Sequence, residues 1–334
     1  MSKRVFTELL LSDMAPSFGV TEPGAIALAV SRARSFTEGK IKSIDLSVNS
    51  GIYKNSFTCG VPGTDEMGIP FAAALGAAAG DWTKGLEALG AVNQQDIARA
   101  QVFLDEGRVH VHLHEISSAL YIRACVSTDS HTAEVTITGV HTNITSIVVN
   151  GECVLHQEPV SRGDQEAEVH SITNYRFSDL WEYASNVPLE EISFIADAYK
   201  LNLALAEEGQ SSEKCTVCKK LIAENGGLYS SDPLKTAHAL TAAAIEARVR
   251  GLPRPAMSIT GSGNHGIIAT LPLYACYTVK KLERETLLRA TALSYLVTQY
   301  IKEYSGKLSA FCGCAVAAGT GFAVGLCYMR GGSR

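Results

Sequence analysis

The amino-acid sequence predicts an α+β fold, with N-terminal helices and an antiparallel β meander followed by an all-helical C-terminal region. From about residue 108 to residue 156, apolar and polar residues alternate almost throughout, a pattern typical of half-buried strands. From about residue 175 onward, apolar residues recur at helical spacing instead. This change of pattern predicts an α+β region over residues 1–174 and a helical region over residues 175–334.

The composition is that of a globular protein. Of 334 residues, 46% are hydrophobic and 19% are charged, which suits one large or two medium domains with buried cores. A formal charge of −5 gives no electrostatic reason to expect a nucleic acid or an anionic membrane as a partner. Nine irregularly spaced cysteines do not fit a disulfide framework, and the first residues make a poor signal peptide. We therefore expect a cytoplasmic protein.

The first half begins with helix and strand signals. Thr21 can cap a helix that has Glu22 and Pro23 in its first turn, because its side chain can accept from a free backbone amide. Apolar and polar residues alternate over residues 44–48, which predicts a strand. Residues 68–82 are rich in Ala and Gly and predict a helix of small residues.

The strand-rich segment comes next. Residues 109–114 and 120–124 alternate between apolar and polar, as do residues 135–137. Asn150-Gly151 lies between two runs of β-forming residues, which is a strong signal for a hairpin with a two-residue turn. We expect an antiparallel meander here rather than a set of βαβ units.

The second half predicts helices with recognisable ends. Residues 192–206 keep helical spacing, and Gly209 stands where a helix would end. Residues 231–251 start with Ser, Asp and Pro and end on Gly, and residues 283–306 repeat this design with acidic residues first and Gly last.

The uncharged segment 308–329 is long enough to cross a bilayer. Much of it is Ala, Gly, Ser and Thr, which gain little from lipid, while Gly and Ala let backbones approach closely. We expect a tightly packed buried helix rather than a C-terminal membrane anchor.

A glycine-rich loop over residues 258–270 fits the pattern G-x-G-x-x-G that holds a dinucleotide. Such a motif should follow a buried strand and open a long helix within a βαβ unit. The segment 254–259, which precedes the motif, is short for a strand and contains a proline. Pro272 would disturb the helix that should follow the motif. A loop that binds a small carboxylate, or a tight turn between helices, therefore fits better than a dinucleotide site.

Histidines and cysteines supply the other candidate sites. His110, His112 and His114 alternate and could pair on a metal, but the exposed face of a half-buried sheet is the simpler interpretation. Cys215 and Cys218 form C-x-x-C, where flanking lysines would lower the thiol pKa, but a solvated helix or loop explains them as well. The segment that contains Cys312 and its neighbour Cys314 is apolar, which predicts buried thiols that are either inert or cluster ligands.

Several stretches, in order along the chain, together resemble one family, the L-cysteine desulfidase group (UPF0597), which is related to the α-subunit of iron–sulfur L-serine dehydratases. They run from about residue 15 to residue 325 and are FGVTEPGAIALA, YKNSFTCGVPGTDEMGIPFAAALGA, GVHTNI, AYKLNLALAEEG, RPAMSITGSGNHGIIATLP and KLSAFCGCAVAAGTG. The ordered set covers nearly the whole chain and is specific.

The resemblance implies a β-elimination without pyridoxal phosphate and without a dinucleotide. In the family an oxygen-sensitive 4Fe–4S cluster acts as a Lewis acid, and a cysteine is thought to remove the α-proton. L-cysteine then gives sulfide, ammonia and pyruvate. An α-proton is weakly acidic and the leaving group is poor, so the site needs a base, an electrophile and a carboxylate clamp. The expected substrate is a small amino acid, L-cysteine or L-serine.

The resemblance also assigns positions. The GSGNHG stretch, with Ser262, Gly263, Asn264 and His265, would bind the substrate carboxylate. Cys312 matches one cluster ligand of the family. The remaining positions at or near the pocket are Lys54, Asn55, Pro62, Gly63, Thr64, His141, Thr142 and Asn143.

Two departures from the family matter. The family's helix start reads G-C-T-E-P with the cysteine as the proposed base, whereas Val20 stands here before Thr21 and Glu22, and valine cannot move a proton. The family also continues into a segment with two more cysteines, proposed cluster ligands that this sequence lacks. Cys314 and Cys327 are poor substitutes for them. We therefore expect the 4Fe–4S cluster to be absent or incomplete, with Cys312 as a partial site.

Two functions follow. The first is a lyase of the desulfidase or serine dehydratase type that is weak or inactive as this chain. The second is a non-catalytic amino-acid-binding or scaffold protein, or one half of a split enzyme. Loss of the terminal segment would expose apolar helix surface, which predicts a homo-oligomer or a partner that completes the segment.

Overall fold

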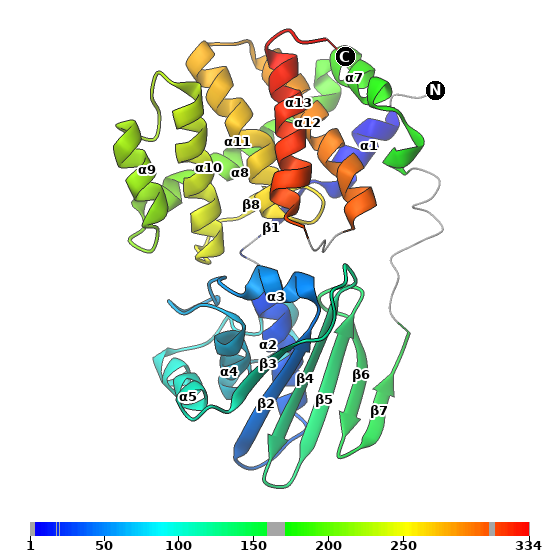
Figure 1. Ribbon diagram of the computed structural model, residues 1–334, viewed down its shortest axis with the longest axis vertical. Helices are drawn as coiled ribbons and strands as arrows, with labels where there is room; N and C mark the ends of the chain where they lie inside the picture. Colours follow the sequence, from blue (N-terminus) through cyan, green and yellow to red (C-terminus); the bar gives the residue numbers. More distant parts are fainter. Residues whose placement is uncertain (1–3, 18, 20, 159–170, 307–310, 334) are drawn as a thin grey trace. The chain divides into compact units, whose positions relative to one another are not determined.

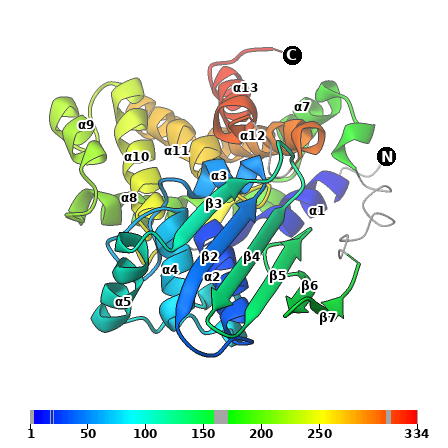
Figure 2. The same cartoon turned by 60° about the horizontal axis from the view of Figure 1, so that its bottom comes forward.

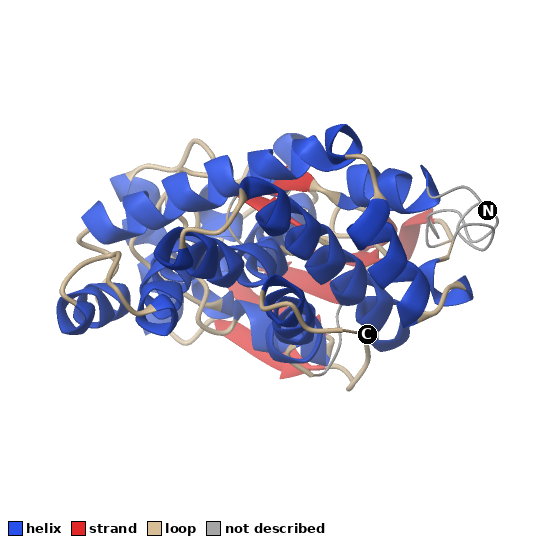
Figure 3. Cartoon of the chain, turned by 90° about the horizontal axis from the view of Figure 1, so that it is seen from above, coloured by secondary structure: helices blue, strands red, loops and turns tan. Residues whose placement is uncertain are grey.

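The computed structural model describes residues 4–17, 19, 21–158, 171–306 and 311–333. The chain divides into two compact units (Figure 1). Among the described residues, 21–158 form the sheet unit, and 4–17, 19, 171–306 and 311–333 form the helical unit. Helices make up most of the described chain (Figure 3), and the predicted α+β class is confirmed. The domain ranges expected from the sequence, 1–174 and 175–334, remain a prediction.

The sheet unit is built on a six-stranded sheet in the order β3-β2-β4-β5-β6-β7 (Figure 2). From β4 to β7 neighbouring strands are antiparallel, which confirms most of the predicted meander. The meander prediction is wrong for β3, which lies parallel to β2, because the helices between these two strands form a crossover long enough for parallel pairing. The strands are β2 (Ile41–Val48), β3 (Val109–Leu113), β4 (Tyr121–Thr128), β5 (Thr132–Thr138), β6 (Ile144–Val149) and β7 (Glu152–His156).

The alternation of residues decides which face of the sheet is covered. Ile44, Leu46 and Val48 of β2 are fully buried, and so are the apolar residues opposite them on β4. Helices α2 and α4 pack against the sheet and complete this core. The helices of the unit are α2 (Thr21–Arg34), α3 (Ser50–Ser56), α4 (Ile69–Ala79), the short η1 (Trp82–Glu87) and α5 (Gln94–Asp105).

The hairpin predicted at Asn150-Gly151 is confirmed. Both residues have positive φ, 51° and 85°, which is the backbone of a type I′ turn, and β6 and β7 pair across it. Gly has no Cβ, and Asn tolerates the left-handed region better than most residues, so these two residues suit the turn.

The helical unit includes the first described helix as well as the second half of the chain. Phe6 and Leu10 of α1 are buried in the same apolar core as α12. Its elements are α1 (Arg4–Asp13), β1 (Ala15–Ser17), η2 (Ile172–Asn174), α7 (Phe177–Asn186), η3 (Leu189–Ile195), α8 (Ala196–Ser211), α9 (Val217–Asn225), α10 (Pro233–Val249), β8 (Ala256–Ser258), α11 (Gly263–Lys280), α12 (Arg284–Ser305), η4 (Cys314–Ala318) and α13 (Gly319–Met329).

Two expectations about helix ends are wrong. Gly209 lies inside α8 and does not end it. A glycine is needed at this position because a Cβ there would meet the backbone carbonyl of Ala243 on α10. Pro272 lies inside α11, which continues to Lys280. Proline removes one hydrogen bond, but α11 packs against both α10 and α12, and this packing holds the helix together.

The segment before α11 contains a short strand, which corrects a second expectation. Residues 256–258 form β8 and pair antiparallel with β1, so the glycine motif does follow a strand and does open a long helix. The sheet has two strands, which are antiparallel, so, among the described residues, the motif does not lie in the parallel βαβ unit that a dinucleotide site requires.

Asn202 ties β8 to α11. Its Oδ1 accepts from the backbone N–H of Met257 at 2.9 Å, and its Nδ2 donates to Thr270 Oγ1 at 3.0 Å. Gly266 completes the join, since a Cβ at this position would overlap the carbonyl of Met257. The start of α11 is therefore held directly against β8.

Within the part of the chain that the structure describes, each helix is too short or too polar to cross a membrane. The segment 311–329 contains η4 and α13, and many of its side chains are exposed or half-buried, so the expected tightly buried helix is wrong there. Residues 308–310 lie outside the described residues.

The close approach at Gly266 predicts a large loss of stability in Gly266→Ala, by about 3 kcal/mol, because the methyl group forces β8 and α11 apart. Gly319→Ala is the matched control. Its Cβ would be 3.4 Å from the nearest heavy atom, and Ala favours a helix over Gly, so its stability should be unchanged or slightly higher. Urea unfolding measures both variants, and equal stability of the two would contradict the role given to Gly266.

Candidate functional site

The glycine loop forms a tight turn at the start of α11. Thr260 and Gly261 both have positive φ, 55° and 71°. The amide of Ser262 donates to the carbonyl of Ile259 at 3.1 Å, which closes the turn. Threonine rarely adopts this backbone conformation, so other contacts must hold it.

Those contacts connect Thr260 to His265. The amide of Thr260 donates to Asp13 Oδ2 at 2.8 Å, and Gln299 Nε2 donates to the same oxygen at 2.9 Å. Thr260 Oγ1 donates to the carbonyl of Ile259 at 2.7 Å and lies 2.6 Å from Nδ1 of the buried His265. Since a hydroxyl has one hydrogen, Nδ1 is the donor in this pair and Nε2 of a neutral His265 carries the lone pair.

Two buried cations lie close to the first turn of α11. Arg248 is 5% exposed, its Nη1 donates to Asn264 Oδ1 at 3.3 Å, and its guanidinium fills the space that a side chain at Gly263 would occupy. Lys302 is 6% exposed. A Cβ at Gly313 would lie 2.6 Å from His265 Nε2 and 3.5 Å from Lys302 Nζ, so the imidazole and the ammonium approach the same backbone segment.

This arrangement suits an anion. A helix N-terminus carries a partial positive charge, and its first amides have no partner within the helix. Buried cations near such a terminus add to its positive potential, and a positive potential attracts an anion. One carboxylate, that of Asp13, already accepts a hydrogen bond from the amide of Thr260 in the turn before α11. Ser262, the N-cap residue, makes no side-chain capping bond, so its hydroxyl can turn toward a ligand.

The expected burial of the cysteines next to this turn is wrong. Cys312 is exposed and Cys314 is half-buried, because they lie at the start of η4 rather than in a packed helix. Cys327 is exposed on α13. Among the described residues, no group of three His, Cys, Asp or Glu side chains could hold a metal ion. The described thiols therefore do not fit a cluster with three protein ligands.

The sheet unit holds a second cluster of expected site residues at the start of α2. Glu22 is 6% exposed, and its carboxylate accepts from Asn55 Nδ2 at 2.7 Å and from Thr21 Oγ1 at 3.3 Å. His141 lies in the turn between β5 and β6, and its buried Nε2 has no hydrogen-bond partner among the described residues. Burial lowers the pKa of His141, and the negative charge of Glu22 opposes this shift.

Other expected residues of the sheet unit bond within their own loops or are exposed. Thr64 Oγ1 donates to the carbonyl of Val61 at 2.9 Å and shapes the loop that contains Pro62 and Gly63. Asn143 Nδ2 donates to the carbonyl of Thr138 at 3.2 Å and closes the turn between β5 and β6. Lys54 and Thr142 are exposed. Val20, the position of the family's proposed base, lies outside the described residues.

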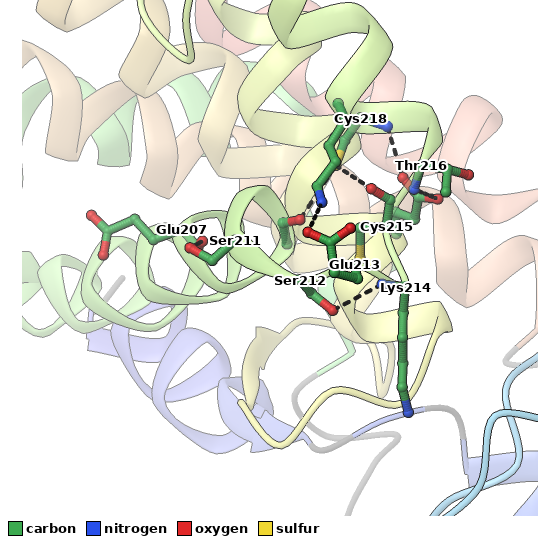
Figure 4. Close-up of polar contacts among 11 residues, drawn as sticks. Glu207, Ser211, Ser212, Glu213, Lys214, Cys215, Thr216 and Cys218 are labelled. Carbon is green, nitrogen blue, oxygen red and sulfur yellow. Dashed lines mark hydrogen bonds and ion pairs between the residues drawn. The ribbon is translucent and has the colours of Figure 1, made fainter.

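The C-x-x-C pair precedes and enters α9 (Figure 4). Both thiols are fully buried, so the expected solvated site is wrong. Burial and the carboxylate of Glu246 raise the pKa of Cys218 to about 12 and raise that of Cys215. The expected lowering by the flanking lysines is therefore wrong as well.

Glu246 of α10 also holds the first turn of α9. Burial acts to raise the pKa of Glu246, but hydrogen bonds from the amides of Cys218, Val217 and Thr216 outweigh it and lower the pKa. The carboxylate thus stays charged beside two neutral thiols. Glu246 therefore joins α9 to α10. The two cysteines beside it have the chemistry of inert buried thiols.

His110 and His112 are exposed on the edge strand β3, as the alternation predicts, and His114 is exposed directly after it. The ring of His114 stacks on Tyr121 with centroids 4.1 Å apart. They belong to no group of three possible metal ligands among the described residues.

Sequence reasoning missed Arg248, Lys302, Thr260, Asp13 and Asn202. A partial signal existed on α12, where buried positions at helical spacing carry polar residues. Those residues are Thr291, Tyr295, Thr298, Gln299 and Lys302. The partners of Asp13 and Asn202 are distant in sequence and leave no local pattern.

Comparisons with known proteins agree with the motifs. Residues 83–334 match the family model described as serine dehydratase alpha chain. A UPF0597 protein of Clostridium botulinum (strain Langeland) is 40% identical over 341 residues, 99% of this chain and 78% of the relative. UPF0597 proteins of Caldanaerobacter subterraneus and Methanocella arvoryzae are 37% and 39% identical, over 99% and 100% of this chain and 77% and 78% of the relatives. No solved structure matches.

The environment of His141 predicts a pH dependence. Because burial lowers its pKa below the ordinary 6.5, the unfolded chain takes up a proton that the folded chain does not as the pH falls through 6.5. The free energy of unfolding should therefore fall below that pH, until the folded-state pKa is passed. His141→Asn should lose this contribution, and Glu22→Gln should lower the His141 pKa further. Urea unfolding between pH 7.5 and 5.5 and NMR titration of His141 measure these effects, and an unchanged pKa in Glu22→Gln would contradict the contact.

Proposed function

Because this chain belongs to the serine dehydratase alpha chain family, with UPF0597 proteins among its relatives, we propose that it binds L-serine or L-cysteine through the amino-acid carboxylate at the start of α11. The observation that carries this proposal is the buried Arg248 beside the first turn of an 18-residue helix. A carboxylate there would lie close to a guanidinium and to the positive end of the helix dipole together.

The neighbouring side chains define how the anion would be held. The amides of Gly263 and Asn264 lie in the first turn, and Gly263 lets a ligand approach the backbone closely. Arg248 can offer a planar pair of N–H donors to a carboxylate. Lys302 and His265 would add a positive charge and a ring nitrogen on the side of Gly313. These donors suit a small acid and offer no platform for a nucleotide base.

We propose further that the chemistry is a β-elimination, as the family resemblance implies, and that it is weak or absent in this chain. The reaction removes the α-proton and the β-hydroxyl of serine as water, or the β-thiol of cysteine as sulfide, and ends in pyruvate and ammonia. Valine at position 20 offers no group that accepts a proton. The described thiols also do not assemble a cluster site. Binding without turnover is therefore the function that these residues support best.

Binding is tested by calorimetry on the full chain under reducing conditions. L-serine should bind, and L-serinamide, which lacks the carboxylate, should bind about 10- to 100-fold more weakly, because a hydrogen bond to a charged group is lost. Arg248→Gln should show the same loss. Arg254→Gln is the matched control, because Arg254 is an exposed arginine of the same unit, paired with Glu208. Equal affinities for L-serine and L-serinamide would contradict the carboxylate site even if Arg248→Gln fails to fold.

Catalysis is tested separately. After anaerobic reconstitution with iron and sulfide, we expect little or no pyruvate from L-serine and little or no sulfide from L-cysteine. Fast turnover, together with the absorbance of an iron–sulfur cluster, would refute the proposed inactivity. It would not contradict the proposed carboxylate site.

Association with a second copy or another chain is also proposed. Phe311 and Val316 are 77% and 51% exposed near the start of η4, and exposed apolar side chains of this kind favour association. We also propose a cytoplasmic location, as expected from the sequence.

A further inference from the structure

We infer that the sheet unit carries a second small-molecule site, a basic pocket that binds an organic anion with an apolar body. The pocket has a volume of about 400 Å³. The C-terminal ends of α2 and α4, helix α5, the first residue of β2 and the turn between α5 and β3 surround it. Its defining residues are Arg34, Lys40, Arg99, Val102, Phe103 and Arg108. The pocket lies wholly within one unit and does not depend on the proposed amino-acid site.

The charge of the pocket points to an anionic ligand. Four cationic side chains line it against one carboxylate, that of Glu106, which pairs with Arg108. A second carboxylate, that of Asp96, pairs with Arg99 from outside the lining, so the cations still outnumber the carboxylates by four to two. Bringing like charges together raises the free energy of the folded state unless a counter-charge is present. A local excess of positive charge in an acidic protein is therefore unfavourable by itself and becomes favourable with an anion.

Two of the arginines are held in place by backbone carbonyls. Arg34 Nη1 donates to the carbonyl of Thr37 at 2.7 Å, and its Nη2 donates to that of Gly39 at 3.2 Å. Arg108 Nη1 donates to the carbonyl of Ile41 at 2.6 Å. Carbonyls orient a guanidinium without neutralising its charge.

The same arginines keep hydrogen-bond donors for a ligand. Arg34 also donates to Thr37 Oγ1 at 2.9 Å, and Arg108 also pairs with Glu106. A guanidinium has five N–H donors, so both arginines have more donors than these bonds use. Donors that are already oriented lose little entropy on binding a carboxylate or a phosphate.

The rest of the lining is apolar. Val102 is 48% exposed, Phe103 is half-buried, and Ile41 and the two alanines at the end of α4 complete the lining. An apolar group of the ligand would cover this surface. Pockets of this size accommodate small organic molecules. A zwitterionic amino acid fits poorly, because its ammonium group would meet the four cations. The ligand class is therefore an aromatic or aliphatic carboxylate or phosphate ester.

The test is calorimetry on the full chain with three probes: 3-phenylpropionate, phenyl phosphate and the neutral 3-phenylpropanol. At least one anionic probe should bind, and the tighter of the two identifies the head group. The neutral alcohol should bind at least about tenfold more weakly. Saturating L-serine should leave the binding unchanged. Absence of binding by both anions, equal binding of the alcohol, or displacement by L-serine would each overturn the inference.

Paired variants locate the site. Lys40→Gln/Arg99→Gln removes two cations that are mostly exposed, so the fold should persist, and the affinity for the anionic probe should fall about tenfold. Lys42→Gln/Lys84→Gln removes the same charge from exposed positions of the same unit outside the lining, and should leave the affinity unchanged. Equal losses in both double variants would show a general charge effect and would overturn the assignment of the pocket.

Discussion

The closest constraint in the helical unit is the contact between the backbone of Gly266 and the carbonyl of Met257. It leaves no room for a side chain, so α11 begins directly against β8 rather than after a flexible loop. Asn202 holds the same two elements through its amide. With both ends fixed, the chain between β8 and α11 must turn within a few residues. The positive φ of Thr260 and Gly261 follows from that requirement.

The tight turn at Thr260 and Gly261 positions the side chains that surround the first residues of α11. Thr260 is held by Asp13 and in turn orients His265, whose Nε2 is directed toward Gly313. Arg248 and Lys302 contribute buried positive charge near the same helix end. Glycines at 263 and 313 are needed because cationic or imidazole side chains occupy the space of their missing Cβ atoms. The glycine-rich loop is thus explained by close packing around charged groups, and the small acid proposed above would bind beside them.

Much of the fold was readable from the sequence, because its signals are local. Alternation gave the strands, and Asn150-Gly151 marked the hairpin through the φ values that its turn requires. The errors arose where tertiary packing overrides a local preference. Gly209 and Pro272 resemble helix ends or breaks, but neighbouring helices keep both inside continuous helices. The parallel pairing of β3 with β2 depends on a crossover and has no signature in β3 itself.

The candidate site was readable only in part, for the same reason. Motif resemblance found Asn264 and His265, but burial and long-range partners decide what these residues can do. Burial raises the pKa of Cys218, which was expected to be lowered by the flanking lysines. Cys312 was expected to be buried and is exposed. Arg248, which carries the proposed binding, is one basic residue among several in its segment. Its importance comes from being buried beside a helix terminus, which no spacing in the sequence reveals.

The most direct measurement is an NMR map of backbone amide shifts as L-serine is added to the isotope-labelled chain. We predict that the largest shifts fall on the amides of Gly261 to Gly266, since these belong to the turn before α11 and to its first turn, where the carboxylate should lie. Binding of L-serine with no shift in those amides would place the ligand elsewhere and contradict the account.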